Sequence, residues 1–149
     1  MKVGKLSIPD ELYFNKEHAW VRQEAEDMVT IGITDYAQYA LRRIKFIYLP
    51  KVGSLVKCGD VVGTVESVKA ISEIYSPVAG KIVDVNTKLV DGPESLNEDP
   101  YRAGWVAKLR ATDLQEGLRS LQTSGQYARY VRGLLKIDKN LLAYRWKRH

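Results

Sequence analysis

The segment that decides the fold is Val61-Val62-Gly63-Thr64-Val65-Glu66-Ser67-Val68-Lys69-Ala70-Ile71-Ser72-Glu73-Ile74-Tyr75-Ser76-Pro77. On each side of Lys69 the residues alternate with a period of two, and many are β-branched, which predicts two strands. The few residues between the strands must then form a hairpin turn with Lys69 near its middle. A lysine held in solvent on a rigid two-stranded arm suits an attachment point that an enzyme must reach and modify.

The residues around this lysine resemble those of a known family. Glu66-Ser67-Val68-Lys69-Ala70 is similar to the lipoyl-attachment motif of the glycine cleavage H-protein family, in which lipoic acid is joined to the turn lysine through an amide. The resemblance continues, in the family's order, over residues 12–109. The other matching segments are residues 13–21, 31–38, 75–80, 83–86 and 97–101, followed by Gly104 and Trp105.

The resemblance implies a covalent lipoate on Lys69. The residues that it assigns to the attachment and recognition motif are Glu66, Ser67, Val68, Ala70 and Glu73. The implied partners are a lipoate–protein ligase or lipoyl transferase and client oxidoreductases. We expect a non-catalytic carrier, because the dithiolane supplies the chemistry and the protein positions it.

Three alternatives to a lipoylated lysine remain open. A lysine in a hairpin turn is often only a solvated charge. A biotin carrier shares the hairpin, but its family places methionines beside the lysine, whereas Val68 and Ala70 flank Lys69 here. The third alternative is an unmodified structural or regulatory homologue in which Lys69 stays a free amine.

Short strands and turn signals fill the chain before residue 110. Strands are predicted at residues 12–14, 19–22, 28–33, 44–49, 81–85 and 104–109, besides the two around Lys69. Thr34 or Asp35 is expected to cap a short helix over residues 36–43, and residues 91–100 are predicted to be a polar loop. The pattern and the resemblance together predict a mainly β fold, a lipoyl-domain-like barrel-sandwich of two antiparallel sheets with a short internal helix.

Helical patterns follow the last predicted strand. Thr112 is the expected N-cap of a helix over residues 112–121, Gly125 is expected to break it, and an apolar stripe predicts a second helix over residues 127–136. We therefore divide the chain into a lipoyl-carrier domain, residues 1–110, and a C-terminal helical extension with a basic tail, residues 111–149.

The net charge of +5 is unevenly distributed. Residues 129–149 hold seven Lys or Arg and one acid, whereas residues 1–128 carry a net charge of −1. Basic and aromatic residues interleave in this tail, a pattern also found in nucleic-acid-binding proteins. No recognised nucleic-acid-binding fold accompanies it, so we favour a solvated basic face or a docking element for an acidic partner.

Several function classes are excluded by composition. No run of 18 apolar residues is present, so we expect no membrane span, and the first nine residues lack the apolar run of a secretory signal. Cys58 is the only cysteine, which precludes an internal disulfide and favours a reducing, cytoplasmic setting. His18 and His149 lie far apart in sequence and provide little material for a metal site. We expect His18 to be packed or hydrogen-bonded rather than catalytic.

The sequence departs from the family at Ala19. The family has His-Glu-Trp where this chain has His18-Ala19-Trp20. The resemblance implies that this carboxylate holds the ammonium end of the glycine-derived cargo, because a buried cation requires a partner. Ala19 cannot do so, and Glu17 and Glu73 are the candidate substitutes.

A second departure concerns surface charge. Basic or neutral residues occupy positions where the family tends to be acidic, namely Arg42, Arg43, Lys45, Tyr48 and Lys51. Reversed charge on a docking face favours different clients, and the alternative is ordinary drift of a solvated face. Our leading interpretation is a lipoate-dependent sulfur oxidation pathway with a heterodisulfide-reductase-like complex. The alternative is the H protein of the glycine cleavage system, which carries the aminomethyl group from glycine decarboxylase to aminomethyltransferase.

Overall fold

The computed structural model describes the backbone of residues 1–148 and the side chains of residues 1–137, so His149 and the side chains from residue 138 onward lie outside the described part. The elements in chain order are β1 (Lys2–Val3), β2 (Leu6–Ser7), β3 (Tyr13–Phe14), β4 (Ala19–Gln23), β5 (Met28–Ile33), α1 (Asp35–Leu41), β6 (Ile44–Tyr48), β7 (Leu55–Val56), β8 (Val61–Ser67), β9 (Ile71–Tyr75), β10 (Gly80–Val85), α2 (Lys88–Asp91), α3 (Ser95–Glu98), β11 (Ala107–Ala111), α4 (Leu114–Arg119) and α5 (Ser124–Arg148).

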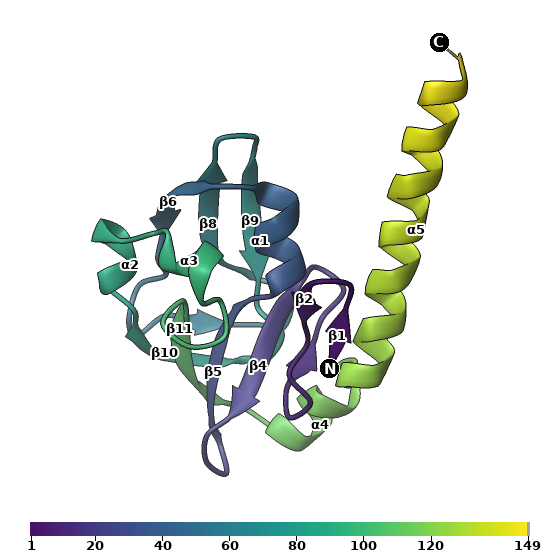
Figure 1. Ribbon diagram of the computed structural model, residues 1–149. Helices are drawn as coiled ribbons and strands as arrows, with labels where there is room; N and C mark the ends of the chain where they lie inside the picture. The colour runs from purple at the N-terminus through teal and green to yellow at the C-terminus, as the bar shows by residue number, and fades with distance from the viewer. Residues whose placement is uncertain (149) are drawn as a thin grey trace.

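Two antiparallel sheets form the body, as predicted. One has the strand order β3-β4-β5-β11-β10-β7, and the other has the order β6-β8-β9. A separate two-stranded ladder joins β1 to β2. Figure 1 shows the β8–β9 hairpin projecting at one end with α1 beside it, while α5 runs past β1 and β2. The barrel-sandwich predicted from the sequence is therefore confirmed.

The main core lies between the two large sheets. Alternate residues of each strand point inward, among them Val21 and Ile31 from the first sheet and Val65 and Ile74 from the second. Each fully buried aliphatic side chain stabilises the fold by about 1.5–3 kcal/mol relative to exposure. Burial on this inner face fixes the register of β8 against β9, because a one-residue slip would turn the apolar set outward.

A second core lies on the other face of β4. Ala19 and Val21 point into the main core, while Trp20 between them packs with Phe14 and Tyr127. The Phe14 and Tyr127 rings stack with centroids 4.3 Å apart. A Cβ at Gly32, which pairs with Trp20, would lie 2.6 Å from the indole ring, so only glycine fits opposite it. Both faces of β4 are therefore buried.

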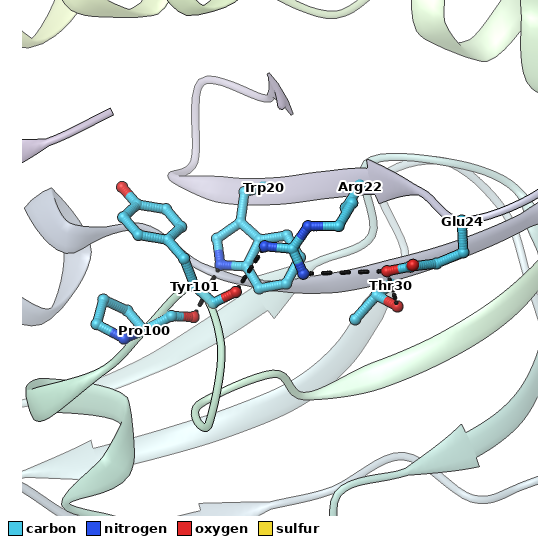
Figure 2. Close-up of polar contacts among 6 residues, drawn as sticks. All are labelled: Trp20, Arg22, Glu24, Thr30, Pro100 and Tyr101. Atoms are coloured by element: carbon cyan, nitrogen blue, oxygen red, sulfur yellow. Dashed lines mark hydrogen bonds and ion pairs between the residues drawn. The ribbon is translucent and has the colours of Figure 1, made fainter. Parts of the chain in front are cut away.

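Backbone carbonyls of a loop pin this second core to the barrel (Figure 2). The Trp20 indole N–H donates to the Pro100 carbonyl at 3.1 Å, and the Arg22 guanidinium donates to the Tyr101 carbonyl at 2.6 Å. Arg22 also covers the Trp20 ring at 4.9 Å and contacts Glu24, which accepts a hydrogen bond from Thr30. These contacts hold residues 100–101 against β4.

The same loop supports the start of α1. The Tyr101 hydroxyl donates to the Ser7 carbonyl at 2.6 Å and accepts from the Asp35 backbone N–H at 3.0 Å. Burial raises the pKa of Tyr101, so the phenol stays protonated as this donor. Thr34 is the N-cap, as expected, and its hydroxyl accepts from Ala37 N at 3.1 Å.

His18 lies in a chain of polar contacts that reaches the same cap. Its Nδ1 lies 2.7 Å from the Tyr127 hydroxyl, which lies 2.8 Å from the Thr34 hydroxyl. The imidazole also stacks on Tyr130 with centroids 5.7 Å apart. Burial lowers the pKa of His18 from 6.5 to about 4, so the ring is neutral at physiological pH. The packed histidine expected from the sequence is confirmed.

The C-terminal helices differ from the prediction in their boundaries. Asp113, not Thr112, occupies the N-cap of α4, and its backbone is left-handed with φ 50°. The break falls at residues 120–123 because Gln122 pairs with Phe14: each backbone N–H donates to the other's carbonyl, at 2.8 and 2.9 Å. Gly125 therefore lies inside α5 rather than ending a helix.

Two other predictions need correction. Residues 91–100, predicted as a loop, include α3, and the last strand begins at Ala107 rather than at Gly104.

The proposed division at residue 110 stays a prediction. Tyr127, Ala128 and Val131 of α5 are buried in the second core, so the start of this helix packs with the N-terminal part of the chain.

The partly buried His18 predicts acid sensitivity. Its folded-state pKa is lower than 6.5, so its contribution to stability is complete above pH 6.5 and is lost as the pH falls toward 4. By pH 4 the loss is about 3 kcal/mol. Denaturant unfolding of the wild type and of His18→Asn, measured between pH 7 and pH 4, checks this. Asn tolerates the positive φ of 70° at this position and does not titrate. Parallel stability curves for the two proteins would contradict the assignment.

Candidate functional site

The candidate site is the turn between β8 and β9. The register pairs Glu66 with Ile71, which leaves Ser67 to Ala70 as the turn. Ser67 N donates to the Ala70 carbonyl at 2.8 Å, so Val68 and Lys69 form the two-residue tip. Both tip residues are exposed, whereas Ser67 is buried. Lys69 therefore stands at the end of the hairpin, as the sequence predicts.

The Ser67 hydroxyl closes this turn. Two-residue hairpin turns ordinarily use residues with positive φ, hence their Asn-Gly and Gly-rich sequences. Neither Val68 nor Lys69 has a positive φ. Instead, Ser67 Oγ accepts from both Lys69 N and Ala70 N at 3.1 Å, and it lies 3.2 Å from the Ala70 carbonyl. The Ser67 side chain thus provides the acceptor for the backbone N–H groups of this turn, which therefore closes without the positive-φ residues of a glycine turn.

Backbone contacts anchor the tip to the body. Val68 N donates to the Arg43 carbonyl at 3.0 Å. Lys69 Nζ lies 3.5 Å from the Ala40 carbonyl, in the last turn of α1, where helix carbonyls attract cations. The tip is therefore attached on one side to the segment that connects α1 to β6.

Asn97 holds that connecting segment in place. Its Oδ1 accepts from Ile44 N at 2.9 Å, and its Nδ2 donates to the Arg42 carbonyl at 2.8 Å and to Gln38 Oε1 at 3.0 Å. Arg42 needs this support, because its φ of 68° and ψ of −155° fall in a region that glycine alone adopts readily. The support of Lys69 thus extends to a residue 28 positions away.

The predicted recognition residues lie on two sides of the turn. Glu66 faces outward from β8 and is half-buried, and Glu73 is exposed on β9. Val68 and Ala70 flank Lys69 and are exposed with it. Sequence reasoning missed the support residues Ala40, Arg43 and Asn97. The first two act through backbone carbonyls, which sequence does not display, but Asn97 lies in a segment that the resemblance had identified.

Ala19 places no carboxylate in this region. It is buried in β4 within the main core, opposite Ile33. Glu17, one of the expected substitutes, is exposed, and so is Glu73. A cleft of about 450 Å³ lies beside α1 and is lined by Gln38, Tyr39, Arg42, Arg43, Glu94, Asn97 and Glu98. Arg42 covers the Tyr39 ring at 5.3 Å.

The described residues form neither a metal site nor a membrane-spanning helix. Among the residues that the structure describes, no three His, Cys, Asp or Glu side chains come together as metal ligands. No helix of the described chain is long and apolar enough to cross a membrane.

A barrel-sandwich that projects one lysine on an anchored hairpin has the architecture of a lipoyl-type carrier domain. A family model described as glycine cleavage H-protein matches residues 12–133. A probable glycine cleavage system H protein from Pyrococcus furiosus is 46% identical over 134 residues, covering 90% of this chain and 99% of that protein. The glycine cleavage system H protein of Escherichia coli O7:K1 is 47% identical over 121 residues, covering 81% and 93%.

A solved structure agrees with these sequence matches. The crystal structure of a glycine cleavage system H protein from Mycobacterium marinum superposes with a TM-score of 0.74 at 36% identity, covering 83% of this chain and 98% of that one. This protein belongs to the glycine cleavage H-protein family. Members of the family are carrier subunits with a lipoate covalently attached to a lysine. The resemblance found in the sequence is therefore confirmed, whereas the comparisons give no support to a sulfur oxidation pathway.

The turn fits a lipoyl group. Lys69 is exposed at the tip, and its contact with the Ala40 carbonyl is long, so acylation of Nζ removes little stabilising interaction. Acylation leaves an amide N–H at Nζ, which keeps one donor while the positive charge is lost. Lys69 is thus the residue that would hold the group.

Removing the turn hydroxyl tests this geometry. Ser67→Ala leaves the Lys69 and Ala70 amides without their shared acceptor, so we expect the free energy of unfolding to fall by about 1–2 kcal/mol. Hydrogen exchange at these two amides should accelerate as well. Ser120→Ala is the matched control, because its exposed hydroxyl makes a single hydrogen bond, to Gly117, and we expect a change within about 0.5 kcal/mol. Equal stability losses in the two variants would refute the role of Ser67.

Proposed function

We propose that this protein is a lipoyl carrier of the glycine cleavage system, modified at Lys69 and acting between glycine decarboxylase and aminomethyltransferase. The observation that carries the proposal is the exposed Lys69 at the centre of an anchored two-residue turn. The glycine cleavage names of the relatives support this client pathway. A reducing cytoplasmic setting is part of the proposal, since Cys58 is the single cysteine and is exposed.

The chemistry at Lys69 is an amide formation. The Lys69 ammonium first loses one proton, and the neutral amine attacks the carbonyl carbon of an activated lipoyl donor. The N–C bond forms, the leaving group departs with its electron pair, and the nitrogen loses a second proton to give the amide. The attached dithiolane supplies redox and group-transfer chemistry when bound. The protein's own contribution is to hold the pivot of the arm.

The turn residues perform this positioning. Ser67 fixes the peptide groups of the tip, and the Arg43 carbonyl ties Val68 to the body. An arm whose base is fixed samples a smaller volume than one on a mobile loop, so its end reaches docked enzymes at a higher effective concentration. Glu66 and Glu73 provide negative charge on the same hairpin for recognition by partners.

One observation favours a different client as a second candidate. The position of the family's carboxylate is occupied by Ala19, which is buried in the apolar core. Arg42, Arg43 and Lys45 add exposed positive charge beside the hairpin. A client with cargo that needs no carboxylate partner, as in the sulfur oxidation pathway inferred from the sequence, fits these residues.

Intact mass and peptide mapping test the attachment site. After expression in a host that attaches lipoate, we expect the wild type to gain the lipoyl increment on Lys69 and Lys69→Arg to remain unmodified. Lys45→Arg is the matched control, because Lys45 is also an exposed lysine beside the hairpin, and it should be modified like the wild type. An unmodified wild type, or a lipoyl group on another lysine, would disprove the proposal.

A separate assay distinguishes the two clients. The lipoylated protein is incubated with glycine, labelled bicarbonate and the glycine decarboxylase of the source organism. Glycine-dependent exchange of carbon dioxide supports the glycine cleavage proposal. A modified protein that supports no exchange above the Lys69→Arg background would instead favour the second candidate.

A further inference from the structure

The hairpin that carries Lys69 has one open face. The inward-facing residues Val65, Ser67 and Ile74 are buried. On the side of α1, the tip is bonded to the Arg43 carbonyl. The side chains of the hairpin that face away from the core can therefore contact a large partner near the lysine.

Strand register arranges these side chains in two rows. The first row, immediately below the turn, runs from Phe46 through Glu66 to Ile71. The second row runs from Tyr48 through Thr64 to Glu73. We define the outer face as Phe46, Tyr48, Glu66, Ile71 and Glu73. Figure 1 shows that β6, β8 and β9 lie side by side beneath the hairpin tip.

The outer face is unusually apolar for a surface that is exposed to solvent. Phe46, Tyr48 and Ile71 retain 51%, 60% and 67% exposure, and all three lie in the two rows below Lys69. Single exposed apolar residues are common, but a cluster of large ones rimmed by charge marks an interaction site. Aromatic side chains such as those of Phe46 and Tyr48 are enriched at protein interfaces, where a few buried anchors carry most of the binding energy.

Geometry brings this face into contact with any enzyme that modifies Lys69. Strands are about 4.8 Å apart and rise about 3.3 Å per residue, so both rows lie within roughly 15 Å of the tip. A stable enzyme complex covers about 800 Å² on each partner, a patch roughly 30 Å wide. Since the tip has only two residues, an active site that encloses Lys69 Nζ brings its rim onto the first row.

We propose that the outer face is the docking surface for the enzyme that attaches lipoate to Lys69. Phe46, Tyr48 and Ile71 are the apolar anchors, and Glu66 and Glu73 face basic side chains of that enzyme. The partner surface is therefore apolar at its centre and basic at its edge, since charge complementarity sets orientation and association rate. This inference rests on the proposed attachment at Lys69.

The test measures modification and binding separately. Unmodified wild type, Phe46→Ser and Ile71→Ser are each titrated with the lipoate–protein ligase of the source organism, lipoate and ATP. Leu55→Ser is the matched control, because Leu55 is 81% exposed on β7, in the other sheet. Exposed positions leave the core intact, and equal melting temperatures confirm folding.

We expect Phe46→Ser and Ile71→Ser each to raise the KM for the carrier about tenfold or more, with kcat within about twofold, and to weaken the Kd for the ligase in parallel. Leu55→Ser should match the wild type. Glu73→Lys should raise the KM most at low salt, because screening weakens the mismatch.

Three results would count against the proposal. If Phe46→Ser and Ile71→Ser are modified and bound like the wild type, the outer face is not the docking surface, although attachment at Lys69 stands. If the wild type forms a dimer that Phe46→Ser dissociates, the face is filled by a second copy of the chain. A wild type that the ligase does not modify at Lys69 counts against both the function and this inference.

Discussion

The structure depends on closing a two-residue turn without glycine. A lysine and a valine occupy the tip of the β8–β9 hairpin, and both have the backbone conformation normal for L-residues. The Ser67 hydroxyl makes this possible, because it accepts the Lys69 and Ala70 amides. The Arg43 carbonyl accepts the third amide, that of Val68. With these donors satisfied, an exposed tip is compatible with a fixed backbone.

Support for the tip extends outward through successive polar contacts. Asn97 fixes the segment after α1, and Thr34 caps the start of α1. The Tyr101 hydroxyl accepts the backbone N–H of Asp35, the first residue of this helix. Residues 97–101 therefore contact both ends of the element that borders the lysine. Side chains that hydrogen-bond to backbone groups connect segments that are far apart in the sequence. One loop can therefore set the position of a site that is formed by other residues.

The sequence allowed much of this to be predicted, because local patterns carry the relevant physics. Alternating β-branched residues gave β8 and β9, and the hydroxyl of Thr34 gave the cap of α1. The break before α5 was misplaced, since it results from pairing between Gln122 and Phe14, which are 108 residues apart. The supporting carbonyls of Ala40 and Arg43 could not be predicted, because any residue type supplies a carbonyl. The client could not be predicted from Ala19 and the basic residues Arg42, Arg43 and Lys45, since one chain's charges do not identify its partner.

The central claim is that Lys69 is presented on a backbone as rigid as the strands beneath it. Nitrogen-15 relaxation of the folded protein tests this most directly through the amide order parameters of Val68 and Lys69. The account predicts values near those of β8, about 0.85, as in regular structure. Values below about 0.6 at both residues, with β8 rigid, would contradict it, because the lysine would then be carried on a mobile loop.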